Sequence, residues 1–334
     1  VCSAITVPYW EDGLPELSGI WQITQLVQSA QIYATVLSDK AIADLARAAG
    51  APSIAGEGRT LYAEALEIDN EGLELLYAAD FSKPLGLTFE KELFKNDKRI
   101  RKPDTEWVLE GDGTAISENG SVKLETNQFT PPSRWEDGEP VWERPAHLNL
   151  FLNRRMPDRI LIEYDLEVWD PHHGLHILFF SATHPNGGSI FQPGLSFRDG
   201  DFRKNILNSE EFLSYHISFW AAPYDIIRRS SNLRKNGKFI LQAVGDDRIV
   251  HEGKGPHRIR VLKDGPRIAA EVNGVKIIDF MDDPEIFGPL YKDGYLGLRM
   301  MGFAKWIKIS DFKVYALPQR DATAPPSLPA SLSF

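Results

Sequence analysis

The sequence contains one cysteine, Cys2, among its 334 residues. No disulfide can form within the chain, and no zinc site or catalytic motif that needs several cysteines can be built. Long hydrophobic runs are also absent. The most apolar stretch, ILFFSA at 177–182, is about a third of the ~18 residues that a membrane-spanning helix needs. We therefore expect no membrane partner, and the stability of the fold must come from packing.

Positive charge is scarce. The chain has 37 Lys and Arg against 47 Asp and Glu, so its formal net charge is −10. Because such a surface repels phosphate backbones, we expect no nucleic-acid partner. Hydrophobic residues make up 43% and charged residues 25%, as in ordinary globular proteins. The chain opens on Val1 rather than on Met, which is compatible with a removed targeting segment and with a secreted or periplasmic location.

Residues 1–75 have the pattern of helices. Apolar residues recur every three or four positions between Trp21 and Ala49. Ser38-Asp39 stands before AIADLARAAG as a helix N-cap, and Gly50 follows as a stop signal. We expect a short helical extension over 1–75, which could cover a face of the fold or form the contact of a homodimer.

From residue 105 onward, apolar and polar residues alternate in more than ten short runs. Tight-turn pairs such as Asn119-Gly120 and Asn273-Gly274 separate them, and the second pair is the strongest hairpin signal in the chain. Turn signals at regular spacing without helices between them predict an all-β fold, an antiparallel sandwich or jelly roll. We expect this domain over 76–316, followed by an extended tail rich in Pro and Ser over 317–334.

The run YHISFW at 215–220 has two distinct faces. One face carries Tyr215 with two apolar side chains, and the opposite face carries His216, Ser218 and Trp220. A histidine, a hydroxyl and an indole on an accessible face favour sugar binding, because sugars present both CH patches and hydroxyls. The alternative interpretation makes His216 a structural histidine and Trp220 a core residue.

A basic stretch follows this run. Residues 198–238 contain eight Lys and Arg against five Asp and Glu, in a chain that is acidic overall. Arg presents a planar fork that matches carboxylate or sulfate, so this stretch beside an aromatic face favours an anionic sugar such as a uronate. Arg198, Arg228, Arg234 and Lys235 are the expected cations. A solvated charged surface is the alternative.

Three carboxylates, Glu163, Asp165 and Glu167, alternate on one side of IEYDLEVWD. Neighbours at i and i+2 on a strand are about 6.6–6.8 Å apart, which is within the range of glycosidase carboxylate pairs. Their repulsion would raise at least one pKa, as a general acid requires. The spacing E-x-D-x-E differs from the E-x-D-x-x-E of laminarinase-type glycoside hydrolases. An acidic outer strand is the alternative.

The histidines of HHGLH, at 172, 173 and 176, do not have the helical spacing of a metal site, because Gly174 interrupts any helix. His172 and His176 share a strand face, which leaves a catalytic or metal-binding role open for His176. The chain has no nucleophile elbow, phosphate loop or dinucleotide fingerprint. We expect no cofactor, with a structural calcium or other metal ion left as an open alternative.

The order of several segments resembles the YesU-like family, domain of unknown function 1961, in the concanavalin A-like lectin/glucanase superfamily. The similarity covers about residues 76 to 316. Its segments are RILIEYDLEVWDPHHGLHILFFSATHPNGGSIFQPGLSFRDGDF, YHISFW, NLRKNGKFILQAVGDD and GYLGLRMMGFAKWIKISDFKVY. The most specific residues are Ile190, Phe191, Arg198, Gly200, His216, Ser218, Asn232, Leu233, Arg234, Lys235, Gly237 and Asp246.

This resemblance implies a jelly-roll sandwich with a concave groove, and an association with the breakdown of polysaccharides, notably uronate-bearing pectins. It does not imply a settled reaction. The helical residues 1–75 lie outside the similarity, and the family pattern does not require the three histidines. The family also tolerates changes at positions matching Asp165 and Glu167, which weakens the hydrolase hypothesis.

Three functions follow from these patterns. The favoured one is β-elimination on a uronate-containing saccharide, with Arg198, Arg234 or Lys235 neutralising the carboxylate. His216, His176, Tyr215 or Tyr224 would supply the base and the acid. The second is a glycoside hydrolase that uses two of Glu163, Asp165 and Glu167, or Asp199 with another acid. The third is a non-catalytic carbohydrate-binding jelly roll, in which Trp220 and Tyr224 stack on sugars and Arg228, Asn232 and the other cations hold carboxylates.

Overall fold

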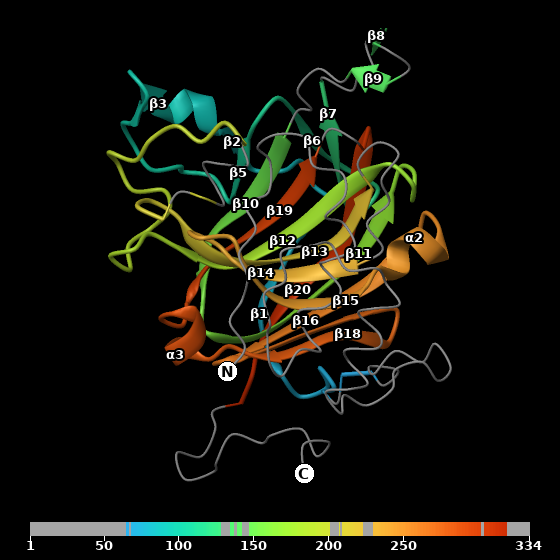
Figure 1. The fold of residues 1–334 in the computed structure, drawn as a ribbon. Helices are drawn as coiled ribbons and strands as arrows, with labels where there is room; N and C mark the ends of the chain where they lie inside the picture. The colour runs from blue at the N-terminus through green and yellow to red at the C-terminus, as the bar shows by residue number, and fades with distance from the viewer. Residues whose placement is uncertain are drawn as a thin grey trace, which may run out of the picture.

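The computed structural model describes residues 65, 66, 68–127, 134–136, 139–141, 147–200, 207, 209–222, 230–301 and 304–318. The expected helices within residues 1–64 and the tail beyond residue 318 lie outside this range. The regular secondary structure of the described part is almost entirely strand, which confirms the all-β prediction. Two large sheets stack face to face as a sandwich (Figure 1). Among the described residues, no helix has the length and apolarity to cross a membrane.

Sheet A has the strand order β18-β17-β16-β11-β20-β7-β6, and β1 pairs with β20 beside it. Its strands are β1 (Glu74–Ala78), β6 (Gly113–Glu118), β7 (Ser121–Thr126), β11 (Arg159–Val168), β16 (His257–Asp264), β17 (Arg267–Val272), β18 (Val275–Met281) and β20 (Trp306–Ala316). All of these pairs are antiparallel. The expected domain boundary after residue 75 falls inside β1 and stays a prediction.

Sheet B has the order β15-β14-β13-β12-β19-β10-β5-β2. Its strands are β2 (Leu87–Phe89), β5 (Trp107–Glu110), β10 (His147–Met156), β12 (Gly174–Thr183), β13 (Leu213–Ala222), β14 (Ser230–Lys235), β15 (Ile240–Asp246) and β19 (Gly294–Met301). β2 and β5 are parallel, and the other pairs are antiparallel.

The remaining elements are short. They are the 3₁₀ turn η3 (Glu90–Leu93), the hairpin of β3 (Phe94–Lys95) and β4 (Lys98–Arg99), the hairpin of β8 (Arg134–Glu136) and β9 (Glu139–Val141), and the helices α2 (Arg248–Glu252) and α3 (Pro284–Phe287). α2 begins at Asp247, whose carboxylate accepts from the Val250 N–H at 3.2 Å. Ile249 of this helix packs into the main core.

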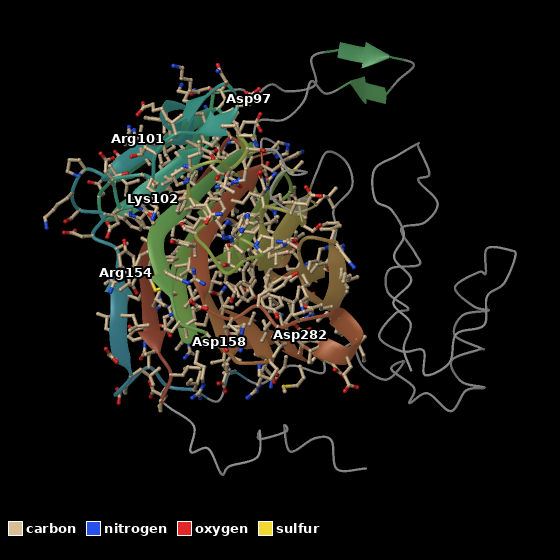
Figure 2. All side chains as sticks on the ribbon, turned by 90° about the vertical axis from the view of Figure 1, so that its left-hand side faces the viewer. Asp97, Arg101, Lys102, Arg154, Asp158 and Asp282 are labelled. Carbon is tan, nitrogen blue, oxygen red and sulfur yellow. The ribbon has the colours of Figure 1, made fainter. Side chains whose placement is uncertain are left out.

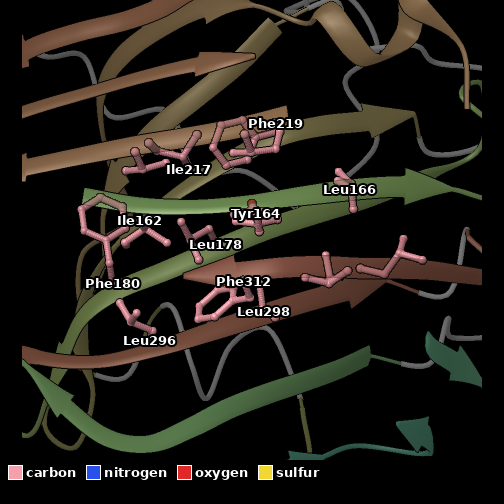
Figure 3. Close-up of a cluster of buried hydrophobic side chains, with 14 of the residues drawn as sticks. Ile162, Tyr164, Leu166, Leu178, Phe180, Ile217, Phe219, Leu296, Leu298 and Phe312 are labelled. Atoms are coloured by element: carbon pink, nitrogen blue, oxygen red, sulfur yellow. The ribbon is translucent and has the colours of Figure 1, made fainter. Parts of the chain in front are cut away.

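The core lies between the two sheets because alternate residues of each strand point into it. Figure 3 shows Tyr164, Ile162 and Phe312 of sheet A against Leu178 and Ile217 of sheet B, all 0–1% exposed. One row of core residues crosses sheet B from strand to strand: Leu109, Leu150, Leu298, Leu178, Ile217 and Leu233. Each such side chain contributes about 1.5–3 kcal/mol by leaving water.

Each sheet also has a small apolar cluster on its outer face. On sheet A, Leu66 and Ile68 pack over Leu161, Leu262 and Ala269. The Leu66 N–H also donates to Glu271 Oε2 at 2.7 Å, which fixes this upstream segment on the sheet. On sheet B, residues 184–200, which we call the cover loop, bring Ile190 and Phe191 onto aromatic side chains of β10 and β12.

Candidate functional site

The outer face of sheet B carries two rows of side chains that run across the strands. The first row is mostly polar and consists of Glu110, Asn149, Arg299, Ile177, Ser218 and Asn232. The second row consists of Val108, Phe151, Gly297, Phe179, His216 and Arg234. Because the intervening row points into the core, both rows face away from it. Three predicted site residues, His216, Asn232 and Arg234, are therefore neighbours on one face.

The cover loop occupies the part of this face formed by β5, β10 and β19. Its Arg198 binds Glu110 of β5: Arg198 Nε donates to Glu110 Oε1 at 2.8 Å, and Nη1 donates to the Ile190 carbonyl at 2.9 Å. The two side chains are 1% and 0% exposed. The prediction that Arg198 binds substrate is wrong for this structure, because its guanidinium lies in the interior and neutralises Glu110.

A second buried ion pair lies beside the first. Arg99 Nη2 donates to Glu90 Oε1 at 2.6 Å, and the Arg99 guanidinium stacks 4.7 Å from the centre of the Phe94 ring. Glu90 Oε1 also lies 3.7 Å from Arg198 Nη2. Burial and then the nearby Glu110 carboxylate raise the pKa of Glu90, and the Arg198 and Arg99 guanidinium groups act against this rise. Buried charges persist only when they are paired, so this network holds the cover loop on the sheet.

His216 has a defined orientation in the other half of the face. The Asn236 amide Nδ2 donates to Ser214 Oγ at 2.6 Å, which leaves the Asn236 carbonyl oxygen as the acceptor toward the ring. His216 Nδ1 lies 2.8 Å from this oxygen and therefore carries the ring proton. In this tautomer the basic nitrogen of His216 is Nε2.

Arg234 and His216 are register partners on β14 and β13, and both contact Phe239. The Arg234 guanidinium lies 4.1 Å from the centre of the Phe239 ring, and the His216 ring stacks on it at 5.9 Å. Phe239 has a φ of 53°, a left-handed conformation that costs a bulky residue on the order of 1–3 kcal/mol. Such strain persists only where the surroundings impose it, and here it sets the ring against both functional groups.

Ser218 and Asn232 form the next register pair on the same two strands. Their side chains are 2% and 4% exposed, and Arg234 and His216 are 6% and 2% exposed. Phe239 and, on β15, Leu241 and Val244 are only half-buried. The face is therefore most open on its β15 side.

Trp220 does not lie on this face. It is 0% exposed in the main core, and its Nε1 donates to the Pro171 carbonyl at 2.8 Å. The expected alternation fails because β12 and β13 lose their regular register between His176 and Ile177: His176 pairs with Trp220, but Ile177 pairs with Ser218. The prediction that Trp220 stacks on a sugar is wrong, and its alternative, a core residue, is confirmed.

His176 is also an interior residue. Its Nδ1 donates to the Arg299 carbonyl at 3.1 Å, so its Nε2 accepts from the Tyr164 hydroxyl at 2.8 Å. Burial lowers the pKa of His176 to about 4, and the side chain is 0% exposed. A catalytic role for His176 is not compatible with this position, because no substrate atom could reach it.

We expect His176 to make the stability of the protein pH-dependent. Its pKa is about 4 in the folded protein and 6.5 as an ordinary value, so only the unfolded chain binds a proton between these pH values. The free energy of unfolding is therefore unaffected by His176 protonation above pH 6.5, and it falls by up to about 3 kcal/mol as the pH drops to 4. Urea unfolding over this range measures the loss. His176→Gln, which cannot titrate, should show a smaller slope, and an equal slope would contradict the assignment.

Tyr215 and Lys235 lie between the sheets at one end of the sandwich. Lys235 Nζ binds Asp282 Oδ2 at 2.8 Å, and the Tyr215 hydroxyl donates to the same oxygen. Burial and then Asp282 raise the pKa of Tyr215 far above 10. Figure 2 shows Asp282 and Asp158 toward the same end of the molecule, away from Asp97 and Arg101. The predicted catalytic role of Tyr215 and the predicted substrate-binding role of Lys235 do not fit this position, because both side chains are buried in this polar cluster.

The carboxylates of β11 lie on the outer face of sheet A. Glu163 is 1% exposed and accepts from Arg258 at 2.8 Å and from Arg260 at 2.7 Å. Asp165 lies 3.4 Å from Arg258. These arginines come from the neighbouring strand β16 and offset the repulsion expected between the carboxylates. Glu163 and Asp165 are therefore on the opposite side of the sandwich from His216, and the alternative of an acidic outer strand fits their position.

Tyr224 and Arg228 lie outside the described residues, so their predicted roles stay predictions. In the described part of the chain, no group of three or more His, Cys, Asp and Glu side chains is placed to hold a metal ion. His172 and His173 are exposed, and the His173 ring lies 3.1 Å from Asp170.

Sequence reasoning missed the residues that orient the site and hold the cover loop: Asn236, Phe239, Glu110, Asn149 and Arg299. A signal was present for Asn149 and Arg299, because each is a polar residue inside a run of apolar strand residues. Arg299 Nη1 donates to Asn149 Oδ1 at 2.9 Å and to the Gly200 carbonyl at 2.8 Å. Polar residues in the middle of strands thus marked the sheet face that binds the cover loop.

Comparisons with known proteins agree with this architecture. The chain is 28% identical over 232 residues to the uncharacterized protein YesU of Bacillus subtilis (strain 168), covering 68% of this chain and 97% of that protein. The crystal structure of a protein of unknown function with a galectin-like fold from Bacillus subtilis is 25% identical. It covers 78% of this chain and all of that chain, with a TM-score of 0.57. The carbohydrate-binding module CBM66 from Bacillus subtilis is 13% identical, with a TM-score of 0.38, covering 64% of this chain and 96% of the module.

The sequence pattern of the family described as domain of unknown function (DUF1961) matches residues 91–309. This range contains both rows on sheet B, the cover loop and the β13–β14 pair. The match extends over more than half of the chain, so this protein belongs to the DUF1961 family.

Proposed function

We propose that this protein binds an acidic carbohydrate on the β13–β14 side of sheet B and cleaves it by β-elimination. The observation that carries the proposal is the register pair of His216 and Arg234. Elimination next to a uronate carboxylate needs a cation for the carboxylate and a base for the adjacent carbon-bound proton. The two groups stand on neighbouring strands, and a concanavalin A-like jelly roll supports a carbohydrate ligand.

Arg234 and His216 would have separate tasks in this reaction. The Arg234 guanidinium neutralises the uronate carboxylate, which makes the proton on C5 more acidic. His216 Nε2, which the hydrogen bond from Nδ1 to Asn236 leaves as the proton acceptor of the ring, takes that proton. The electron pair of the C5–H bond forms a C4=C5 double bond, the C4–O bond breaks, and the leaving oxygen takes up a proton from water. The products are an unsaturated uronate and a new chain end.

The hydrolase hypothesis has less support. Glu163 and Asp165 lie across the sandwich from Arg234 and are engaged by arginines. On the proposed face, Glu110 is engaged by Arg198. The anionic nature of the ligand, a homodimer and a secreted or periplasmic location also remain part of the proposal.

Incubation with polygalacturonate, alginate and neutral glucans tests this function. Elimination produces unsaturated uronates, which absorb in the ultraviolet, whereas hydrolysis produces reducing ends without that absorbance. Binding of acidic oligosaccharides without either product would reduce the proposal to a non-catalytic carbohydrate-binding jelly roll. Absence of both binding and turnover with all acidic saccharides would overturn it.

Substitution of Arg234 should weaken acidic ligands selectively. Arg234→Ala removes a charge-assisted contact of about 1.5–3 kcal/mol, so binding of oligogalacturonate should fall roughly 10- to 150-fold. Arg234→Lys should recover part of the loss, because it keeps the charge without the planar fork. Isothermal titration with acidic and neutral oligosaccharides measures both.

The matched control is Lys238→Ala, which removes the same charge from an exposed residue of the adjoining turn. It should change the binding of acidic ligands little. If Lys238→Ala and Arg234→Ala weaken binding equally, the effect is one of net charge, and a specific contact with Arg234 is disproved.

A further inference from the structure

We infer that the site accepts the end of a saccharide chain and not its interior. This inference rests on the proposed function, and it concerns which part of an acidic carbohydrate can reach His216 and Arg234. A sheet face that is open from edge to edge can bind a polymer along its length. Here the part of the face formed by β5, β10 and β19 is filled by the protein itself.

The cover loop packs on that part of the face at several points. Phe191 lies 6.3 Å from the Phe151 ring of β10 and 5.2 Å from the Tyr295 ring of β19. Ile190 and Phe191 are 0% and 1% exposed. The loop is also bonded to the β3–β4 hairpin, where Arg99 N donates to the Leu195 carbonyl at 2.9 Å. The loop therefore belongs to the folded core.

Gly200 shows how closely the end of the loop approaches the sheet. Its φ is +75°, and a Cβ at this position would lie 2.4 Å from the His147 carbonyl oxygen and 3.2 Å from Gly111 Cα. Only glycine fits between these backbone atoms. No space remains there for a sugar ring between the loop and strands β5 and β10.

Arg198 is bound to other residues of the protein and is 1% exposed, so it is not available to a ligand. Its guanidinium neutralises Glu110 from above the sheet, 5.9 Å from the Phe151 ring and 5.5 Å from the Phe212 ring. The arginine that the sequence predicted as the partner of a uronate carboxylate thus pairs with a carboxylate of the protein itself.

Two aromatic rings mark where the filled region ends. Phe212 lies 6.0 Å from the Phe179 ring, and the Phe179 ring lies 5.8 Å from His216. Both phenylalanines are 0% exposed. A saccharide that enters from the half-buried β15 side, past Leu241 and Val244, therefore meets a wall directly after His216. The wall leaves no path for a saccharide chain to continue past His216.

Binding to galacturonate oligomers and to a polymer of about ten times their length tests this inference. Chain-end binding depends on the concentration of ends, so at equal uronate concentration the apparent affinity for the polymer should be roughly tenfold lower. Equal affinity per uronate unit would overturn the inference and leave the proposed function intact. No binding of either ligand would instead remove the proposed function, and the inference with it.

Product analysis on the polymer gives an independent readout for an active enzyme. Cleavage at ends should release one small unsaturated product from the first time point, while viscosity falls slowly. A ladder of product sizes with an early loss of viscosity would show cleavage within the chain and would overturn the inference.

Discussion

Replacement of Glu110 by leucine is expected to lower the free energy of unfolding by about 3–5 kcal/mol, which is the usual cost of leaving a buried charge without its partner. Arg198, 1% exposed, would lose the acceptor of its Nε and Nη2 hydrogen bonds. Asn149 would also lose its bond to Glu110 Oε2, at 3.1 Å. Urea unfolding with linear extrapolation measures the change.

The double variant Glu110→Leu/Arg198→Met is the control. It removes both charges, so it should be more stable than Glu110→Leu alone, because well-packed apolar residues can replace a buried ion pair at little cost. Glu90 keeps Arg99 as its partner in this variant. If the double variant instead loses the sum of the two single effects, the pair is not energetically coupled and does not hold the cover loop in the way described.

Replacement of His216 by glutamine is expected to lower the rate of β-elimination by about 10²- to 10⁴-fold, the usual contribution of a general base. Glutamine preserves a polar side chain of similar length but cannot accept the C5 proton. Binding of oligogalacturonate should change much less than the rate. The rate of ultraviolet absorbance increase and isothermal titration separate the two effects.

Asn236→Ala tests the same role of His216 by removing the residue that orients its ring. Asn236 does not contact the proposed substrate but fixes the His216 tautomer through Nδ1. Its loss should change the pH profile of the rate as well as its maximum. A His216→Gln protein with an unchanged rate would exclude His216 as the base, and an Asn236→Ala protein with only lower stability would exclude the positioning role.

The sequence predicted the sandwich well because its turn signals are local. Asn119-Gly120 lies between β6 and β7, and Asn273-Gly274 lies between β17 and β18. All four residues have positive φ, from 51° to 77°, as this pair of residue types favours. Period-two alternation in the flanking strands then fixed which side chains enter the core.

The site was predicted less well, because its details depend on contacts between distant segments. Alternation put His216 on the outer face correctly, but it put Trp220 there as well, since the irregular register opposite His176 leaves no mark in the local pattern. Alternation also cannot tell which face of which sheet forms a groove. Alternation correctly put Glu163 on the strand face opposite its apolar neighbours. It could not identify the arginine partners of Glu163, Arg258 and Arg260, which are more than ninety residues away.

The charge count near Arg198 was misleading for a related reason. A count of the basic residues in a segment assumes that every one of them is available to a ligand. Arg198 instead forms an ion pair with Glu110, 88 residues earlier in the chain, and Lys235 forms one with Asp282, 47 residues later. Composition within a segment cannot reveal such partners. The register of Arg234 beside His216 could not be predicted either, because the basic stretch gives no sign of the strand β14 that carries Arg234.

The segment around Leu66 and Ile68 bears on how the molecule can be shortened. Trimming the chain to the family match at 91–309 would strip Leu161, Leu262 and Ala269 of their cover. It would also remove β1 together with the part of β20 that pairs with it, including the core residues Phe312 and Val314. Leucine side chains that become exposed on a sheet face favour self-association of the protein. The smallest autonomous unit of this protein therefore starts upstream of residue 66, well before the stretch by which its relatives are detected.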